Sequence, residues 1–156
     1  MNISNRLMLA LLSFLMLAPL ARADTPESSK AENRAAVEKS FAAWRAGTES
    51  PFDLLAKDAV WTVEGFSSSA GSYSPKELKA LIIPFNAALA KPLVPTVPML
   101  YADGNTVIAR FKASAPLKSG STYTNTYAWF LRFRDRKVVE VNAFLDLGVF
   151  EDVVNR

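Results

Sequence analysis

Two apolar-rich segments near the end of the chain, residues 121–133 and 138–147, predict a β-hairpin. A short polar link, residues 134–137, joins them. With a two- or four-residue loop, Phe133 faces Val138, and the pairing then places Asn125 opposite Asp146. A three-residue loop with a bulge would shift this register by one residue.

One face of the predicted hairpin is an aromatic wall with a polar cluster at one end, which is typical of a ligand cavity. In this register the wall consists of Tyr123, Asn125, Tyr127, Trp129, Leu131, Phe133, Val138, Glu140, Asn142, Phe144 and Asp146. The other face then carries Thr122, Thr124, Thr126, Ala128 and Phe130 with Val139, Val141, Ala143, Leu145 and Leu147. The second strand is therefore apolar on both sides, and such strands are covered on both sides. We expect helices on one side and, on the other, a second copy of the protein in a two-fold dimer.

Upstream of the hairpin, apolar residues recur at helical spacing. Val37, Phe41 and Trp44 form one stripe, the sequence from Ser29 to Glu32 resembles a capping box, and Gly47 is a plausible stop. A short helical turn follows at residues 50–55.

The middle of the chain alternates between strand and helix signals. Residues 58–64 predict a strand, and the clearest helix start is at residues 74–77, with Pro84 expected to kink the helix that follows. Three prolines in residues 91–98 favour an edge strand, and a turn then leads into a strand at residues 106–115. Helices come early and antiparallel strands late, so the predicted class is α+β.

The first twenty-three residues read as an export signal. Arg6 precedes an apolar run at residues 7–17, and Ala21 and Ala23 form a small-x-small cleavage site. The run is shorter than the roughly 20 apolar residues of a membrane span, so no stable membrane anchor is expected. We predict cleavage after Ala23, a single domain at residues 24–156, and a periplasmic or secreted protein.

The composition of the chain limits the kinds of ligand and catalytic group that it can use. The full chain carries 18 basic and 15 acidic residues, and the leader contains two of the basic ones and no acid. A nearly neutral mature protein gives no support for nucleic-acid binding. The sequence contains no Cys and no His, so the usual base near neutral pH and the usual transition-metal ligand are missing. We expect neither a metal nor a cofactor.

The order of elements resembles the nuclear-transport-factor-2-like superfamily, with its SnoaL-like branch, related to polyketide cyclases and ketosteroid isomerases, as the nearest group. The resemblance is carried by residues 41–47, 55–61, 71–74, 125–135, 137–141 and 144–146. It implies a cone-shaped, curved mixed or antiparallel sheet wrapped around about three N-terminal helices, with frequent dimers. The superfamily includes enzymes and non-catalytic binders, so the fold alone does not select a chemistry.

The resemblance also implies site residues. Asp146 matches the last-strand Asp that acts as a base in SnoaL-like cyclases, and Glu64 lies near the base position of ketosteroid isomerases. From the residues themselves, Asp146 and Asn125 are the candidate catalytic pair, since burial in an apolar cavity would raise the carboxyl pKa towards neutrality. Alternatively, Asp146 is a structural carboxylate and Glu64 a solvated strand end.

The remaining candidates are ligand contacts. The aromatic ones would stack on a flat apolar ligand or simply pack the core, and Tyr123 would donate a phenol proton or be a surface hydroxyl. The candidate ligand-binding residues are Tyr127, Trp129, Phe144, Trp61, Tyr123, Asn142 and Glu64. The sequence thus favours an exported binder of a small apolar or aromatic molecule. A cofactor-free isomerase, cyclase or hydratase that uses Asp146 as general base is the alternative, and an interaction module using the open sheet face is a third.

Overall fold

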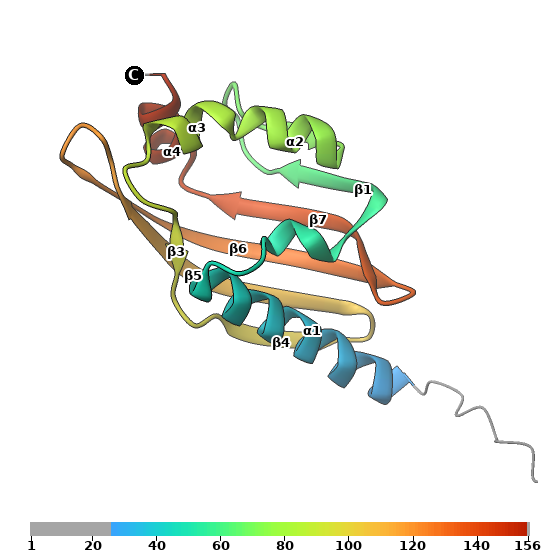
Figure 1. Ribbon diagram of the computed structural model, residues 1–156. Coiled ribbons are helices and arrows are strands. Elements are labelled where there is room, and N and C mark those ends of the chain that lie inside the picture. The colour runs from blue at the N-terminus through green and yellow to red at the C-terminus, as the bar shows by residue number, and fades with distance from the viewer. Residues whose placement is uncertain (1–25, 156) are drawn as a thin grey trace, which may run out of the picture.

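The computed structural model describes residues 26–155 (Figure 1). The predicted export signal, residues 1–23, lies outside the described residues. None of the helices described in residues 26–155 is both long enough and apolar enough to cross a membrane. The elements, in chain order, are α1 (Pro26–Ala46), the 3-10 turn η1 (Pro51–Leu54), β1 (Leu55–Val63), β2 (Gly71–Tyr73), α2 (Pro75–Leu81), α3 (Ile83–Ala88), β3 (Val94–Pro95), β4 (Met99–Asp103), β5 (Thr106–Pro116), β6 (Thr122–Arg134), β7 (Lys137–Leu145) and α4 (Leu147–Val154).

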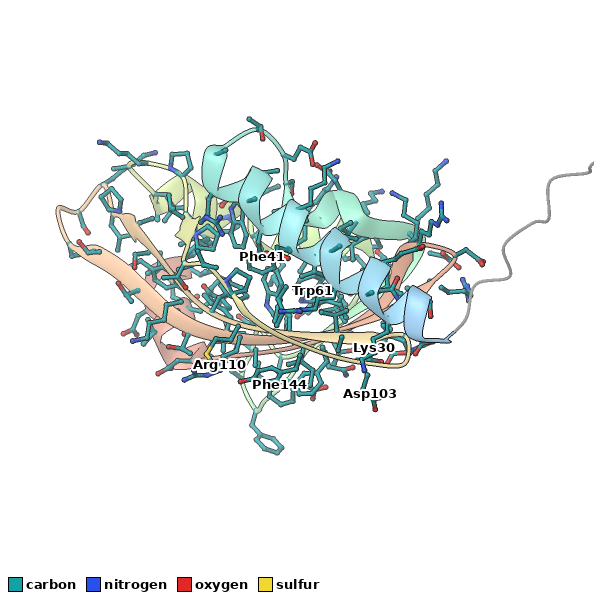
Figure 2. All side chains as sticks on the ribbon, turned by 90° about the horizontal axis from the view of Figure 1, so that it is seen from below. Lys30, Phe41, Trp61, Asp103, Arg110 and Phe144 are labelled. Atoms are coloured by element: carbon teal, nitrogen blue, oxygen red, sulfur yellow. The ribbon has the colours of Figure 1, made fainter. Side chains whose placement is uncertain are left out.

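The strands form one curved, open sheet in the order β2-β1-β7-β6-β5-β3, with β4 also paired to β5. β1 runs parallel to β7, and every other neighbouring pair is antiparallel. Figure 2 shows α1 lying across one face of this sheet. The predicted α+β class with a curved mixed sheet wrapped around helices is confirmed.

Helix α1 presents the predicted stripe to the sheet. Val37 and Phe41 are fully or almost fully buried and Trp44 is half-buried. The helix ends at Gly47, whose φ of 71° permits a Schellman cap. In that cap, the Gly47 N–H donates to the Trp44 carbonyl and the Thr48 N–H donates to the Ala43 carbonyl, both at 3.0 Å. The expected capping box at Ser29 is wrong, because the helix already begins at Pro26.

The helix start predicted at residues 74–77 is confirmed. The Ser74 side chain accepts from the Glu77 N–H, and the Glu77 carboxylate accepts from the Ser74 N–H at 2.8 Å. Pro84 does more than kink the helix that follows. Because Pro84 supplies no N–H to continue the ladder, α2 ends at Leu81 and a separate short helix, α3, begins at Ile83.

The β6–β7 hairpin differs from its predicted register in one respect. The turn residues Asp135 and Arg136 both have positive φ, 50° and 62°, as a two-residue type I′ turn requires, and Phe133 pairs with Val138 as predicted. A bulge at Val139 then shifts the pairing by one residue. Arg132 therefore faces Glu140.

The bulge reverses the faces of the last strand. Trp129 pairs with Ala143 and Tyr127 with Leu145, so these small and aliphatic residues point towards the helices. The predicted inward positions of Glu140, Asn142 and Phe144 are wrong, and so are the predicted outward positions of Val141, Ala143 and Leu145. Figure 2 shows Phe144 on the side of the sheet away from Phe41 and Trp61.

The last strand is also shorter than predicted. β7 ends at Leu145, and Asp146 caps a C-terminal helix, α4, that was not expected. Phe150 and Val153 of α4 are buried in a cluster with Phe85 and Tyr123. Leu147, predicted as a strand residue on the outer face, is half-buried at the start of α4.

Candidate functional site

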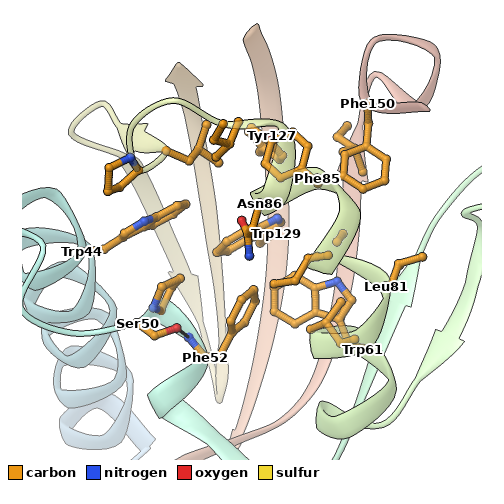
Figure 3. A pocket seen from close by; sticks show the side chains of 18 of the residues that line it. Trp44, Ser50, Phe52, Trp61, Leu81, Phe85, Asn86, Tyr127, Trp129 and Phe150 are labelled. Carbon is orange, nitrogen blue, oxygen red and sulfur yellow. Dashed lines mark hydrogen bonds between the residues drawn. The ribbon is translucent and has the colours of Figure 1, made fainter. Parts of the chain in front are cut away.

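A cavity of about 640 Å³ lies between the concave face of the sheet and the helices (Figure 3). α1, η1, α2, α3, α4 and the central strands all contribute to its wall. The described residues that line it are mostly apolar: Trp44, Gly47, Glu49, Ser50, Pro51, Phe52, Trp61, Val63, Ser69, Leu78, Leu81, Ile82, Phe85, Asn86, Leu89, Ala90, Lys91, Pro92, Leu93, Tyr127, Trp129, Ala143, Leu145, Leu147 and Phe150. This size and lining suit a small apolar molecule.

Aromatic rings form one side of the cavity. The indole planes of Trp44 and Trp129 are parallel within 5°, with centroids 5.9 Å apart, although the residues come from α1 and β6. Trp61 of β1 meets Trp129 edge to face at 4.9 Å. Tyr127 stacks on Phe111 of β5 at 4.9 Å. Each ring is thus held by another ring from a different element.

A buried chain of hydrogen bonds runs behind this wall. The Asn125 Nδ2 donates to the Tyr123 hydroxyl at 3.0 Å, and the hydroxyls of Tyr123 and Tyr127 lie 2.7 Å apart. All three side chains are buried, with exposed fractions of 3%, 2% and 8% respectively. Burial raises the pKa of both tyrosines above the ordinary value of 10, so both phenols stay protonated near neutral pH.

The predicted pair of Asn125 and Asp146 is in contact, but not through the carboxylate. The Asn125 side chain donates to the Asp146 carbonyl at 2.8 Å and accepts from the Asp146 amide at 3.0 Å. The Asp146 carboxylate is exposed, accepts from the Val149 N–H at 3.1 Å, and is not part of the cavity lining. The expectation that this acid sits in an apolar hollow is wrong, because the chain turns into α4 here and uses the Asp as a helix cap.

Three further predicted contacts lie on the opposite face of the sheet. Asn142 donates to Glu64 Oε1 at 2.8 Å, and the ring of Phe144 is 46% exposed. Their predicted place in the cavity is therefore wrong, because the bulge at Val139 turned Asn142 and Phe144 outward. Of the other predicted ligand contacts, Tyr127, Trp129 and Trp61 line the cavity, and Tyr123 lies directly behind Tyr127.

Sequence reasoning left much of the cavity wall unassigned. Phe52 of η1 and Leu81 of α2 line the cavity, and so do Phe85 of α3 and Phe150 of α4. Trp44 of α1, a candidate stacking contact from the sequence, lines it as well. The helical stripes on α1 and α2 show that these residues face inward, but the pattern does not show that the helices stand off from the sheet. For α4, an Asp followed by apolar residues at helical spacing was a usable signal.

Charge is scarce at this site. Among the described lining residues, the only formally charged side chains are Glu49 and Lys91, and both are exposed. No group of three or more carboxylates that could hold a metal ion occurs in residues 26–155. The arrangement therefore provides aromatic surface and a neutral phenol rather than an acid–base pair.

Solved structures share this fold. An NTF2-like protein from Burkholderia xenovorans is 22% identical, with a TM-score of 0.58, over 81% of this chain and 98% of its own. AclR, a putative hydroxylase from Streptomyces galilaeus, is 21% identical, with a TM-score of 0.65, over 81% and 86%. A putative polyketide cyclase from Xanthomonas campestris is 15% identical, with a TM-score of 0.65, over 81% and 99%.

No curated protein matches the sequence. The family profile described as "SnoaL-like domain" matches residues 21–141. That match extends from before α1 into β7, so it includes the elements that hold the aromatic wall. The chain therefore belongs to the SnoaL-like domain family.

Proposed function

We propose that this protein binds a small apolar or aromatic molecule in its cavity and does not turn it over. The observation that carries the proposal is an aromatic cavity of about 640 Å³ whose only formally charged lining residues, among those described, are the exposed Glu49 and Lys91. Transfer of apolar surface from water into such a site contributes about 25 cal/mol per Å². Flat rings also gain from stacking on Trp and Tyr.

Turnover with Asp146 as general base has less support. A general base must come within hydrogen-bonding reach of the proton it removes. The Asp146 carboxylate is exposed and caps α4, and the Asn125 amide that was to assist it is engaged with backbone groups and Tyr123. The geometry of these residues therefore supports binding better than catalysis by Asp146.

A neutral fluorescent probe tests the binding proposal. Nile red, a neutral flat dye without an N–H or O–H donor, should bind the purified protein with one site per chain and brighten as it leaves water. Leu81→Trp places a much larger side chain in the cavity wall, so it fills part of the space for the probe and should weaken probe binding at least tenfold. Ala35 is exposed on α1, so Ala35→Phe serves as the control and should change little. Probe binding that is absent, or equal in the wild type and Leu81→Trp, would refute the proposal.

We also propose that the chain is exported and acts in the periplasm or outside the cell. Arg6, the apolar run at residues 7–17 and the cleavage site at Ala23 support this. Edman sequencing of the protein secreted by an expressing bacterium should begin at Asp24. A cytoplasmic protein that retains Met1 would contradict the proposal.

Finally, we propose a homodimer through the outer face of the sheet. Large apolar side chains are exposed there: Val60, Met99, Tyr101, Phe130 and Phe144 are 37–54% exposed. Val60, Phe144 and Phe130 lie on the neighbouring strands β1, β7 and β6, and Met99 and Tyr101 lie on β4, beyond β5. The rings of Phe130 and Phe144 are in contact, with centroids 5.7 Å apart. An exposed apolar patch of this kind is typical of an interface, and the near-zero net charge expected for the mature chain does not oppose self-association.

Light scattering at micromolar concentration tests the dimer. The wild type should have twice the chain mass, and Phe144→Glu should be a monomer because it buries a charge at the centre of the face. Phe66 is fully exposed in the loop between β1 and β2, so Phe66→Glu is the matched control and should remain dimeric. A monomeric wild type would exclude this interface.

A further inference from the structure

The cavity wall contains hydrogen-bond donors that the protein does not use. All three tryptophans of the chain line the cavity. An indole N–H can only donate, and within residues 26–155 none of the three has a hydrogen-bond acceptor. In that region, every side-chain nitrogen or oxygen that is closed off from solvent has a hydrogen-bond partner. The three N–H groups therefore reach open space, although Trp61 and Trp129 are only 5% and 6% exposed.

Tyr127 supplies a fourth donor. The Tyr123 hydroxyl accepts from Asn125 Nδ2. Among the described residues, the acceptor that the Tyr123 hydroxyl proton can reach is the Tyr127 oxygen. Either hydroxyl of this pair can donate, but only Tyr127 also lines the cavity, so we infer that Tyr123 donates to Tyr127 and no proton is left buried without an acceptor. The Tyr127 oxygen is then an acceptor, and its proton is free to point into the cavity that Tyr127 lines.

Acceptors are much rarer on the same wall. The only side-chain carboxylate among the described lining residues is that of Glu49, which is exposed. Ser50 Oγ is at the mouth and already accepts from the Phe52 N–H at 3.2 Å. Asn86 also lines the cavity and is exposed, and its amide offers both a donor and an acceptor. The hydroxyl of Ser69, another described lining residue that is 5% exposed, can accept as well as donate. Among the lining residues that are not exposed, the three indole N–H groups and the Tyr127 hydroxyl still outnumber the side-chain acceptors, which are Ser50 and Ser69.

We propose that the ligand is a neutral, flat aromatic molecule whose edge carries hydrogen-bond-acceptor oxygen atoms, of the ketone, quinone or aryl ether type. This inference rests on the proposed binding function and specifies the ligand class for the same cavity. The oxygen atoms accept from Tyr127 and from the indole N–H groups while the rings stack on the aromatic wall. A ligand that brings its own N–H or O–H is disfavoured, because it would place donor against donor.

Three probes of nearly the same shape separate these contributions. Fluorene offers only apolar surface, carbazole adds an N–H donor, and 9-fluorenone adds a carbonyl acceptor. Affinities are measured by titration calorimetry on the purified protein. We expect 9-fluorenone to bind about threefold to tenfold more tightly than fluorene, as one net hydrogen bond gives, and carbazole to bind no more tightly than fluorene. Apolar surface alone would favour fluorene.

Two matched substitutions test the assignment to Tyr127. Tyr127→Phe removes the donor but keeps the ring, so it should abolish the preference for 9-fluorenone while fluorene affinity changes by less than about twofold. Tyr123→Phe, one residue deeper in the same chain of hydrogen bonds, should keep the preference because Tyr127 retains its proton. In a ¹H–¹⁵N NMR spectrum, the three indole N–H signals should include at least one that moves downfield with 9-fluorenone and not with fluorene.

The outcomes of these experiments test the proposed ligand class and the proposed binding function separately. Fluorene and 9-fluorenone binding equally well would overturn the inference and leave the proposed binding function intact. A preference that survives in Tyr127→Phe, with all indole signals unmoved, would overturn it as well. If none of the three probes binds up to its solubility limit, the proposed function itself fails.

Discussion

The side chain of Asn125 holds the backbone of Asp146 by both of its polar atoms. Its Nδ2 donates to the Asp146 carbonyl at 2.8 Å, and its Oδ1 accepts from the Asp146 amide at 3.0 Å. The same side chain donates to the Tyr123 hydroxyl and accepts from the Thr126 N–H at 2.8 Å. One buried amide thus fixes the junction of β7 and α4 and orients the phenol behind the cavity wall.

Removal of this amide should destabilise the fold strongly. Asn125→Ala removes the side chain that pairs three part-buried backbone groups, the Asp146 carbonyl and the Asp146 and Thr126 amides, and a buried polar group without a partner costs about 1–3 kcal/mol. We expect a loss of about 3 kcal/mol in the free energy of unfolding, measured by urea denaturation. Asn142→Ala breaks one hydrogen bond on the outer face and should cost less than about 1 kcal/mol. Equal losses for the two variants would contradict the role given to Asn125.

Asp146 should contribute through capping rather than through its charge. Its carboxylate accepts from the Val149 N–H at the start of α4, and Asn is an equally good residue at an N-cap. Asp146→Asn should therefore leave stability within about 0.5 kcal/mol, whereas Asp146→Ala should lose about 1 kcal/mol in thermal or urea unfolding. If Asp146→Asn instead abolished turnover of an identified substrate, the binding proposal would give way to the enzymatic one.

The tight turn between β6 and β7 should be improvable. Asp135 and Arg136 both adopt the left-handed conformation, which costs non-glycine residues about 1–2 kcal/mol each. Replacement of Asp135 by Asn and Arg136 by Gly gives the pair that type I′ turns favour. The double variant should unfold at a higher urea concentration, with a gain of about 1 kcal/mol. The exposed contact of Arg136 with Glu32, at 3.8 Å, is too weak to reverse this sign.

Glu151 should make stability depend on acid pH. The Ser68 hydroxyl, at 2.8 Å, and the Ser69 N–H, at 2.9 Å, donate to its carboxylate and lower its pKa from the ordinary 4.5 to about 2. Because the folded pKa is the lower one, the ionised group stabilises the fold above pH 4.5, and this contribution is lost as the pH falls towards about 2.

The measurement is a comparison of the wild type with Glu151→Gln across this range. The stability difference between them should be constant above pH 5 or so and shrink between pH 4.5 and about 2. Glu38→Gln, an exposed substitution of the same type on α1, controls for the loss of a charge. A difference that stays constant down to pH 2 or so would mean that the serines do not hold the carboxylate.

Most of the fold could be predicted from short sequence signals. The Ser74 capping box, the stop at Gly47 and the stripe through Val37 and Phe41 depend on neighbouring residues, and they form as expected. The predicted faces of the last strand were wrong because the register was counted from the turn alone. Its own alternation, with Val141 inward and Asn142 outward, already contradicted that count, since polar residues alternate with apolar ones on a half-buried strand.

The site was recovered in part for the same reason. Tyr127, Trp129 and Trp61 were assigned to the cavity from strands, where the pattern of alternate faces is strict. Phe85 and Phe150 were not, because their positions depend on how far α3 and α4 stand from the sheet. That distance is set by tertiary packing, and no periodicity in the sequence expresses it.

The parallel pairing of β1 with β7 has a consequence for biogenesis. Trp61 has Val141 as its neighbour, so the middle of the sheet joins the first strand of the chain to the last one. A ribosome-bound nascent chain that lacks β7 offers β1 only the three-residue strand β2 as a partner, so its sheet is incomplete. Pairing between such distant segments also slows folding. The central strands of the sheet can come together only after β7 has been made, which favours folding after synthesis over folding during it.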